Sequence, residues 1–263
     1  MDESALYNKI GVEYDETRRA DEFLTKRFRH FLSPSENENY LDVGCGTGNY
    51  TCALALGKHQ FYGIDPSELM LAKARQRNCN VIWQNGDAEN LPFENEFFGG
   101  AIAGLTIHHW KNLDRAFGEI YRVLKQSGRF VLFTSLPEQM ESYWLNYYFP
   151  EMMRVSIEQM PALSKVKGAL QNAGFEIETL EKYFVTDNLQ DHFLYCGKHR
   201  PELYLREEIR RGISSFSSLA NKDEVERGLQ KLADDIEEGK ISEIIESYGN
   251  EKGDYIFIVA RKS

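Results

Sequence analysis

Three glycines at alternate positions, Gly44, Gly46 and Gly48, follow Asp42 in the stretch YLDVGCGTG. Glycine adopts backbone angles that other residues avoid, and because it lacks a Cβ atom it lets main-chain N–H groups come close to a ligand. A helix that starts just after this turn would present its first amides to a carboxylate or a phosphate. The pattern indicates a turn that binds a polar small molecule, although a tight strand-to-helix turn without a ligand uses glycine as well.

An acidic residue ends the next apolar segment, QFYGID, at Asp65. In a parallel sheet the carboxyl ends of neighbouring strands lie at one edge, so Asp65 is expected beside the glycine turn. A carboxylate in that position accepts hydrogen bonds from two ribose hydroxyls, which predicts a nucleoside in the ligand. Capping of the next helix is the alternative role for Asp65, but Ser67 is available for that purpose.

Two adjacent imidazoles, His108 and His109, follow a further apolar segment. They would lie where a second substrate meets the bound nucleoside. Histidine exchanges a proton near neutral pH, so either residue is a candidate general base. Packing inside the protein is the alternative role for both, since a second substrate that is already nucleophilic needs no protein base.

The segments that must position these residues alternate between apolar strand patterns and amphipathic helix patterns. Strands are expected at 39–44, 60–65, 80–87, 99–109, 128–135 and 175–185, and helices at 49–57, 66–78, 113–125 and 162–174. Near-continuous apolar strands separated by amphipathic helices are typical of a parallel sheet that is covered on both faces. A last strand at 253–262 is expected to pair antiparallel with 175–185.

Two segments interrupt this alternation: an aromatic and methionine-rich stretch at 137–161, and a polar, helix-favouring stretch at 187–250. The predicted fold class is α/β, with a seven-stranded, mostly parallel Rossmann-like sheet, an antiparallel last strand, helices on both faces and a helical insertion between the last two strands. Residues 39–186 together with 251–263 would form the core. The two interrupting stretches would be helical insertions and candidates for a cap over the substrate.

Composition excludes several classes of function. The chain has 263 residues and a net charge of −10, and its hydrophobic content of 42% is that of a globular protein. An excess of acidic residues argues against nucleic-acid binding, because contacts to phosphates need clustered lysine and arginine. No apolar run is long enough to cross a bilayer, and the first residues lack the basic and apolar parts of a secretory signal, so a cytoplasmic protein without membrane contact is expected. The four cysteines lack metal-site and redox-site spacings, so reduced thiols and no metal are expected.

Four motifs occur in order along the chain: LDVGCGTG, GID, GDAENLPF and RVLKQSG. In this combination the sequence resembles the class I S-adenosylmethionine-dependent methyltransferases, of the type that includes the ubiquinone and menaquinone biosynthesis enzymes. The chain departs from the family pattern at Phe98-Gly99, where an acidic residue is common, and at Gln126, where proline is usual. Neither position normally holds the cofactor.

The resemblance implies S-adenosylmethionine as the cofactor and S-adenosylhomocysteine as its product. Asp42 would orient the glycine turn, and Asp65 would bind the ribose. The methionine part of the cofactor would be lined by three residues of the turn, Gly44, Cys45 and Gly46. The adenine would be held by four residues that follow the second and third strands, Pro66, Met70, Asp87 and Ala88.

The stretch YNKIGVEYDETRRAD, residues 7–21, resembles the segment that often closes over the cofactor in this family. Residues 1–38 would accordingly form an N-terminal helical cap over the cofactor. Tyr7, Tyr14 and Arg18 are the candidates there for contact with the cofactor. A helix that is simply docked on the sheet is the alternative for this segment.

Aromatic side chains in the first insertion are candidates for an acceptor pocket, because small-molecule sites are commonly lined by aromatic and a few polar groups. These candidates are Tyr143, Trp144, Tyr147 and Tyr148. The second insertion would add polar side chains, with His192, Tyr195, His199 and Arg200 available. Ordinary core packing is the alternative, since the tyrosines also lie at helical spacing.

The sequence therefore predicts a methyltransferase that moves a methyl group by in-line displacement to a small-molecule acceptor, with an aromatic acceptor favoured. Two other functions stay open. A nicotinamide-dependent oxidoreductase shares the strand, the turn and the acid, although its fingerprint is GxGxxG and the spacing here is GxGxG. A non-catalytic S-adenosylmethionine-binding regulatory module would keep all the cofactor residues.

Overall fold

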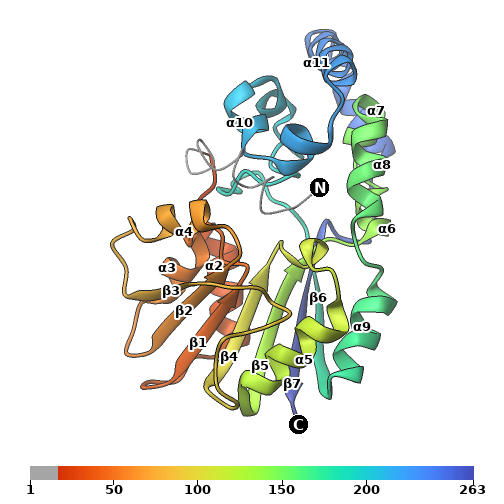
Figure 1. Cartoon of the computed structure of the whole chain (residues 1–263). Coiled ribbons are helices and arrows are strands. Elements are labelled where there is room, and N and C mark those ends of the chain that lie inside the picture. Colours follow the sequence, from red (N-terminus) through yellow and green to blue (C-terminus); the bar gives the residue numbers. More distant parts are fainter. Residues whose placement is uncertain (1–16) are drawn as a thin grey trace.

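One seven-stranded sheet forms the centre of the computed structural model, which describes residues 17–263 (Figure 1). The strands are β1 (Asn39–Val43), β2 (Gln60–Asp65), β3 (Val81–Asn85), β4 (Phe98–Gly104), β5 (Leu124–Thr134), β6 (Phe175–Tyr183) and β7 (Tyr255–Lys262). Their order in the sheet is β3-β2-β1-β4-β5-β7-β6. Strands β1 to β5 pair in parallel, whereas β7 runs antiparallel to both β5 and β6. The predicted fold class and the predicted pairing of the last strand are confirmed.

Helices cover both faces of the sheet (Figure 1). The main ones are α2 (Glu22–Leu32), α3 (Asn49–Leu54), α4 (Glu68–Ala74), α5 (Leu113–Val123) and α9 (Leu163–Asn172). Alternate residues of a strand point to opposite faces, so Tyr40 of β1 packs in the core with α2, and Leu41 packs in the core with α5 and α9. Ser67 is the N-cap of helix α4, and its hydroxyl accepts a hydrogen bond from the backbone N–H of Met70. Ser67 is the capping residue that the sequence indicated.

The two interrupting stretches lie above the carboxyl ends of the strands (Figure 1). The first contains α6 (Pro137–Met140), α7 (Leu145–Tyr148) and α8 (Pro150–Glu158). The second contains η3 (Pro201–Leu205), α10 (Glu207–Arg211), η4 (Ser215–Leu219), α11 (Lys222–Glu237) and α12 (Ile241–Ser247), and η4 is a π-helix. Residues 187–200 form bends and turns in place of the helix expected there.

Buried polar contacts hold the two insertions together. Glu224 of α11 is only 8% exposed, and its carboxylate accepts hydrogen bonds from the backbone N–H groups of Glu151 at 2.6 Å and Met152 at 3.1 Å. These are the first amides of α8, which have no partner within their own helix. The hydroxyls of Ser156 in α8 and Ser215 in η4 also share a hydrogen bond of 2.9 Å. The insertions therefore form one layer.

Strand β4 ends at Gly104, although the sequence pattern predicted a strand that reaches residue 109. Leu105 adopts a φ of 54°, a left-handed backbone conformation that cannot continue a strand. A short turn of 3-10 helix, η2 (Ile107–His109), follows. His108 and His109 consequently lie on a turn at the carboxyl end of β4 and not on the strand.

The expectation that all four cysteines are reduced thiols is corrected by the structure. Cys52 of α3 and Cys79, which precedes β3, form a disulfide, while Cys45 and Cys196 are free. The Cα atoms of the pair lie 5.5 Å apart, within the usual range for a disulfide. The pairing joins residues 27 positions apart in the sequence, and only the fold brings them together.

The turn between β1 and α3 is fixed by packing and by one buried carboxyl group. An added Cβ at Gly48, where φ is 76°, would overlap the ring of Trp83, so this glycine is required by packing. Asp42 is 4% exposed, and its Oδ2 accepts a hydrogen bond of 2.6 Å from the hydroxyl of Thr51 in α3. Burial raises the pKa of Asp42 to about 7 in spite of this hydrogen bond.

Replacing Gly48 with alanine is expected to lower the free energy of unfolding by about 1 to 3 kcal/mol, because Trp83 must move and the backbone is left-handed. Gly168→Ala in α9 is the matched control, since no atom lies within 4 Å of its added Cβ. That variant should gain up to about 1 kcal/mol from the higher helix propensity of alanine. Urea denaturation measures both changes, and a neutral Gly48→Ala would contradict the packing described for Trp83.

The stability contributed by Asp42 should depend on pH. Its pKa rises from 3.8 to about 7 on folding, so the folded protein binds this proton more tightly than the unfolded chain does. Between these two pH values its contribution to the free energy of unfolding falls as the pH rises, by about 1.4 kcal/mol for each pKa unit. Asp42→Asn cannot ionise, so it should gain stability relative to the unmodified protein over this interval. Urea denaturation across the pH range tests this, and a difference that does not change with pH would contradict it.

Candidate active site

A cavity of about 310 Å³ is lined by residues from the carboxyl ends of β1, β2 and β4 and by residues of both insertions. The connections from β1 and from β4 lead to opposite sides of the sheet, and open α/β sheets bind ligands at such a switch point. The predicted site residues that line this cavity are Arg18, Asp42, Gly44, Cys45, Gly46, Asp65, Pro66, Met70, Asp87, Ala88, His108 and His109. Tyr7 and Tyr14 lie outside the described residues.

The three glycines of the turn serve different purposes. An added Cβ at Gly44 would overlap Thr106, and one at Gly48 would overlap Trp83. Gly46, with φ of 55°, has no atom within 4 Å of the position of an added Cβ, and it lines the cavity. Gly46 is therefore the position at which a side chain would occupy space available to a ligand.

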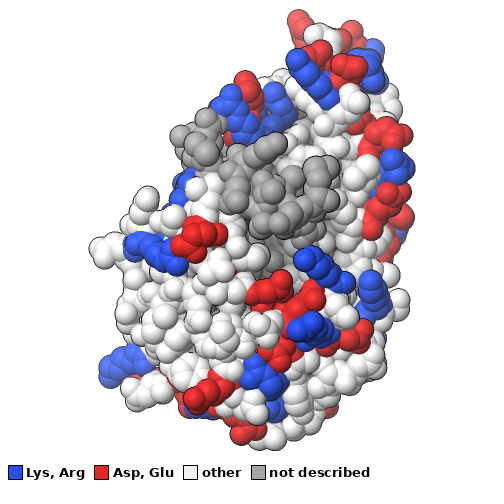
Figure 2. Space-filling model, viewed as in Figure 1, with Lys and Arg blue, Asp and Glu red and all other residues white. Residues whose placement is uncertain are grey.

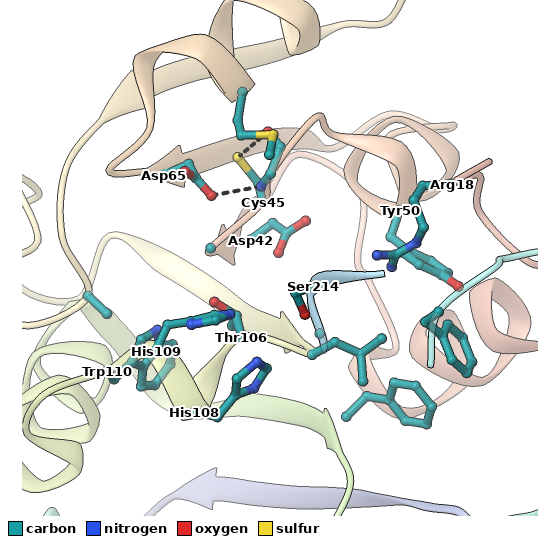
Figure 3. A pocket seen from close by; sticks show the side chains of 18 of the residues that line it. Arg18, Asp42, Cys45, Tyr50, Asp65, Thr106, His108, His109, Trp110 and Ser214 are labelled. Carbon is teal, nitrogen blue, oxygen red and sulfur yellow. Dashed lines mark hydrogen bonds between the residues drawn. The ribbon is translucent and has the colours of Figure 1, made fainter. Parts of the chain in front are cut away.

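Asp65 ties the end of β2 to the glycine turn. Its Oδ2 accepts a hydrogen bond of 2.9 Å from the backbone N–H of Gly46 (Figure 3). Its Oδ1 accepts one of 2.8 Å from the backbone N–H of Ser67. A carboxylate offers about four lone-pair sites, so two remain for hydroxyl groups of a ligand. Burial raises the pKa of Asp65, although the two backbone hydrogen bonds oppose this effect.

The residues predicted for the adenine line the cavity beyond Asp65. Asp87 follows β3, and its Oδ1 accepts a hydrogen bond of 2.8 Å from the backbone N–H of Glu89, which holds the carboxylate in a turn. Met70 and Ala88 are 2% and 6% exposed and supply apolar surface beside it. An acceptor oxygen next to apolar surface is suited to a flat, amino-bearing ring.

An ion pair closes the opposite side of the glycine turn. The Arg18 guanidinium donates a hydrogen bond of 2.5 Å from Nε to Oδ1 of Asp191, and the Tyr50 hydroxyl donates one of 3.1 Å to Oδ2 of the same carboxylate. Figure 3 shows the side chains of Arg18 and Tyr50 next to each other. The Asp191 side chain is only 1% exposed. Sequence reasoning missed Asp191, because no motif surrounds it and only the fold brings it to residues 18 and 50.

His108 and His109 are both neutral at physiological pH. Burial, with a smaller effect of the adjacent His109 ring, holds the pKa of His108 well below its ordinary value, and burial lowers that of His109 to about 4. Their ring centroids lie 3.9 Å apart. Nδ1 of His108 is enclosed and has no hydrogen-bond partner among residues 17–263. In Figure 3 the His108 ring lies across the cavity from Asp65.

Five of the predicted acceptor-pocket residues do not line this cavity: Tyr143, Trp144, Tyr147, Tyr148 and His199. Tyr143 and Trp144 are buried, with the Tyr143 hydroxyl bonded to that of Tyr204 at 2.5 Å and Trp144 Nε1 donating to the carbonyl of Lys198. They serve the core that joins the two insertions, which needs apolar bulk of its own.

The remaining three candidates are also engaged elsewhere. Tyr148 is buried and donates a hydrogen bond of 3.0 Å to Asp235 of α11, and Tyr147 is 45% exposed with Lys231 over its ring. Nε2 of His199 lies 2.8 Å from the carbonyl oxygen of Val185. Of the four polar candidates in the second insertion, Tyr195 is the one that lines the cavity.

In the sheet, β1 and β4 separate β5 and β7 from Asp65 at the end of β2. The cavity residues that come from the two insertions and from the region of β5 and β7 line what is here called the acceptor compartment. They are Phe133, Ser135, Met140, Ser156, Gln159, Met160, Phe193, Leu194, Tyr195, Ile213, Ser214, Ser215, Leu219 and Tyr255. No local sequence pattern marks them, because they come from five separate segments. One feature of the structure does point to this part of the cavity: η4 is a π-helix, and π-helices are frequent at functional sites.

Residues 17–263 contain no cluster of three or more histidine, cysteine, aspartate or glutamate side chains that could hold a metal ion. The helices of the same range are too short or too polar to cross a membrane.

Comparisons with known proteins agree with this geometry. A family model described as "Methyltransferase domain" matches residues 41–132. A demethylmenaquinone methyltransferase of Staphylococcus epidermidis is 30% identical over 200 residues, covering 65% of this chain and 83% of that protein. The bifunctional biotin biosynthesis protein BioHC of Teredinibacter turnerae is 28% identical over 68% of this chain but only 35% of that protein. A demethylmenaquinone methyltransferase of Symbiobacterium thermophilum is matched over 56% of its length.

Solved structures show the same likeness. A candidate methyltransferase from an antibiotic biosynthesis pathway of Anabaena variabilis is 34% identical, with a TM-score of 0.82, and the match covers 92% of this chain and 98% of that one. The [4+2]-cyclase SpnF, 21% identical with a TM-score of 0.58, shares the fold alone. The residues that line the cavity beside Gly46 and Asp65 fit the cofactor expected from the sequence. On the identity and coverage of these relatives, the chain belongs to the family of class I S-adenosylmethionine-dependent methyltransferases.

Proposed function

We propose that this protein transfers a methyl group from S-adenosylmethionine to a small-molecule acceptor by in-line displacement, and that an aromatic acceptor suits its site. One observation carries the proposal: a site that fits the cofactor and an apolar compartment lie in the same cavity. Membership of the methyltransferase family favours S-adenosylmethionine over the nicotinamide alternative.

The cofactor end of the cavity offers a distinct group for each part of S-adenosylmethionine. Asp65 would accept the ribose hydroxyls with its remaining lone pairs, and Asp87 with Ala88 would hold the adenine. The main chain at Gly46 would face the methionine part, with Arg18 and Asp191 nearby at the rim. When bound, the cofactor supplies a methyl group on a positively charged sulfur.

The acceptor compartment supports a small, partly apolar acceptor. Phe133, Phe193, Tyr195 and Tyr255 present aromatic surface to it. Holding two reactants in line contributes about 7 to 11 kcal/mol to lowering a barrier, so positioning by these walls accounts for most of what such an enzyme must provide. The walls also exclude water from the reacting groups.

The surface charge supports a small molecule over a nucleic acid. Figure 2 shows lysine and arginine side chains interspersed with aspartate and glutamate on the face in view, with no continuous basic tract. The net charge of −10 adds to this. Nucleic-acid binding needs clustered basic residues to neutralise phosphates.

Asp65→Ala should weaken binding of S-adenosylhomocysteine about tenfold to a hundredfold, because a hydrogen bond to a charged group contributes about 1.5 to 3 kcal/mol. Asp187→Ala, at an exposed residue outside the cavity, is the control and should leave affinity unchanged. Isothermal titration calorimetry measures both dissociation constants. Unaltered affinity in Asp65→Ala would remove the ribose assignment.

Incubating the protein with cell extract and methyl-deuterated S-adenosylmethionine should yield a small molecule whose mass is raised by the labelled methyl group. Mass spectrometry of the extract identifies this product, and heat-denatured protein is the control. If the protein binds S-adenosylhomocysteine but labels no compound, it is a binding module and the proposed activity is wrong.

A further inference from the structure

The acceptor compartment contains no formally charged side chain among the described residues that line it. The charged lining residues are Arg18, Asp42, Asp65, Asp87, Glu89, Lys111 and Asp191, and all belong to the glycine turn, the adenine side or the rim. Asp254, which precedes Tyr255 of the compartment, is paired with Lys198 at 2.6 Å. The described residues of the compartment therefore add no formal charge of their own, and an acceptor bound there would face the positive charge of the cofactor's sulfonium.

Among residues 17–263, no side chain in the compartment or in the adjoining turn at the end of β4 is suited to take a proton at neutral pH. The candidates are His108, the adjacent His109, and the hydroxyls of Tyr195 and Tyr255. Burial lowers the pKa of both imidazoles and raises those of both phenols, so all four are neutral. An imidazole that acts as a base is commonly supported by a carboxylate on its second nitrogen, whereas Nδ1 of His108 is enclosed without any partner among residues 17–263.

The enclosure of Nδ1 also decides what His108 offers to a ligand. A buried N–H without an acceptor is rarer and more costly than a bare lone pair, so the proton of the neutral ring belongs on Nε2. His108 lines the cavity and is partly exposed there. Its Nε2 is thus a hydrogen-bond donor toward the compartment.

We propose that the methyl acceptor is a phenol or an enol that binds as its oxyanion, and that His108 holds this oxygen by donating a hydrogen bond from Nε2. The proposal rests on the methyl-transfer function proposed above and names the acceptor class for the same site. His108 is then a positioning donor in contact with the substrate, and the general-base role considered for it from the sequence is replaced.

The charge balance of the step agrees with this acceptor. The oxygen electron pair forms the new bond to the methyl carbon, the carbon–sulfur bond breaks, and sulfur keeps the released pair. An anion and a cation thus become two neutral products, and no proton is transferred to the protein. Attack by a neutral amine would instead leave a cation in a compartment whose described residues include no carboxylate to receive it.

A phenolate or enolate also fits the walls better than a carboxylate or a phosphate does. Compact anions need arginine, lysine or several donors when they leave water, and the described residues of the compartment include neither arginine nor lysine. A delocalised oxyanion has a large apolar part, which the aromatic walls accommodate, and one oxygen, which a single donor such as His108 can serve.

The test uses 4-nitrophenol, whose anion is yellow, with protein saturated with sinefungin, a stable analogue that carries an amine in place of the sulfonium. At about pH 6, the ratio of anionic to protonated 4-nitrophenol should be about tenfold higher for the bound probe than for the probe in free solution. Protein saturated with S-adenosylhomocysteine, which lacks the positive charge, should show a smaller effect. Absorbance of the probe gives this readout without any turnover.

Two variants separate a donor from a base. His108→Gln keeps an N–H donor at the reach of Nε2 and should bind the probe anion within a few-fold of the unmodified protein, whereas His108→Leu should bind it about tenfold or more weakly. Equal binding by His108→Leu and the unmodified protein would overturn the proposal. Thermal denaturation of both variants identifies any loss of folding, and His108→Met then replaces His108→Leu if that variant fails to fold.

Other results also decide the question. A probe that binds in its protonated form, or 4-nitroaniline that binds as tightly as 4-nitrophenol, would overturn the oxyanion proposal. So would absence of probe binding to a protein that binds sinefungin normally. Failure to bind sinefungin or S-adenosylhomocysteine is a different result, because it contradicts the proposed function itself.

Discussion

The hydrogen bond from the backbone N–H of Gly46 to the carboxylate of Asp65 is the contact on which the site depends. It joins the turn after β1 to the end of β2, so the geometry of one cannot change without the other. The buried Asp42 and the ring of Trp83 hold the same turn from its other sides. Because packing and hydrogen bonds fix the main chain before any ligand arrives, binding does not have to order it.

The cavity divides into two parts with different electrostatics. The cofactor end is formed by strand ends and the glycine turn and carries the carboxylates, whereas the acceptor compartment is formed largely by the insertions and carries none among residues 17–263. A cationic cofactor therefore meets anionic groups on its nucleoside side and an uncharged wall where its methyl group would be transferred. Such a wall strengthens every charge interaction beside it, since little water is present to screen it.

The sheet and the cofactor end were predictable from the sequence, and the acceptor compartment was not. Gly46 and Asp65 stand in local patterns whose geometry follows from strand order, and they line one cavity as that order requires. Tyr143 and Trp144 had the composition of a pocket, yet burial of the insertions needed them as core. Asp191 and Arg18 are 173 positions apart in the sequence, and no local pattern indicates that they form an ion pair. The Cys52–Cys79 pairing was missed for the same reason.

The carboxylate of Glu224 makes the two insertions depend on each other for folding. It belongs to one insertion and accepts hydrogen bonds from the first amides of a helix in the other, where it is almost fully buried. A chimaera that exchanged only one of the two segments would leave these helix amides without an acceptor, or this carboxylate without its donors. We therefore expect such a chimaera to be less stable than one in which both segments are exchanged together.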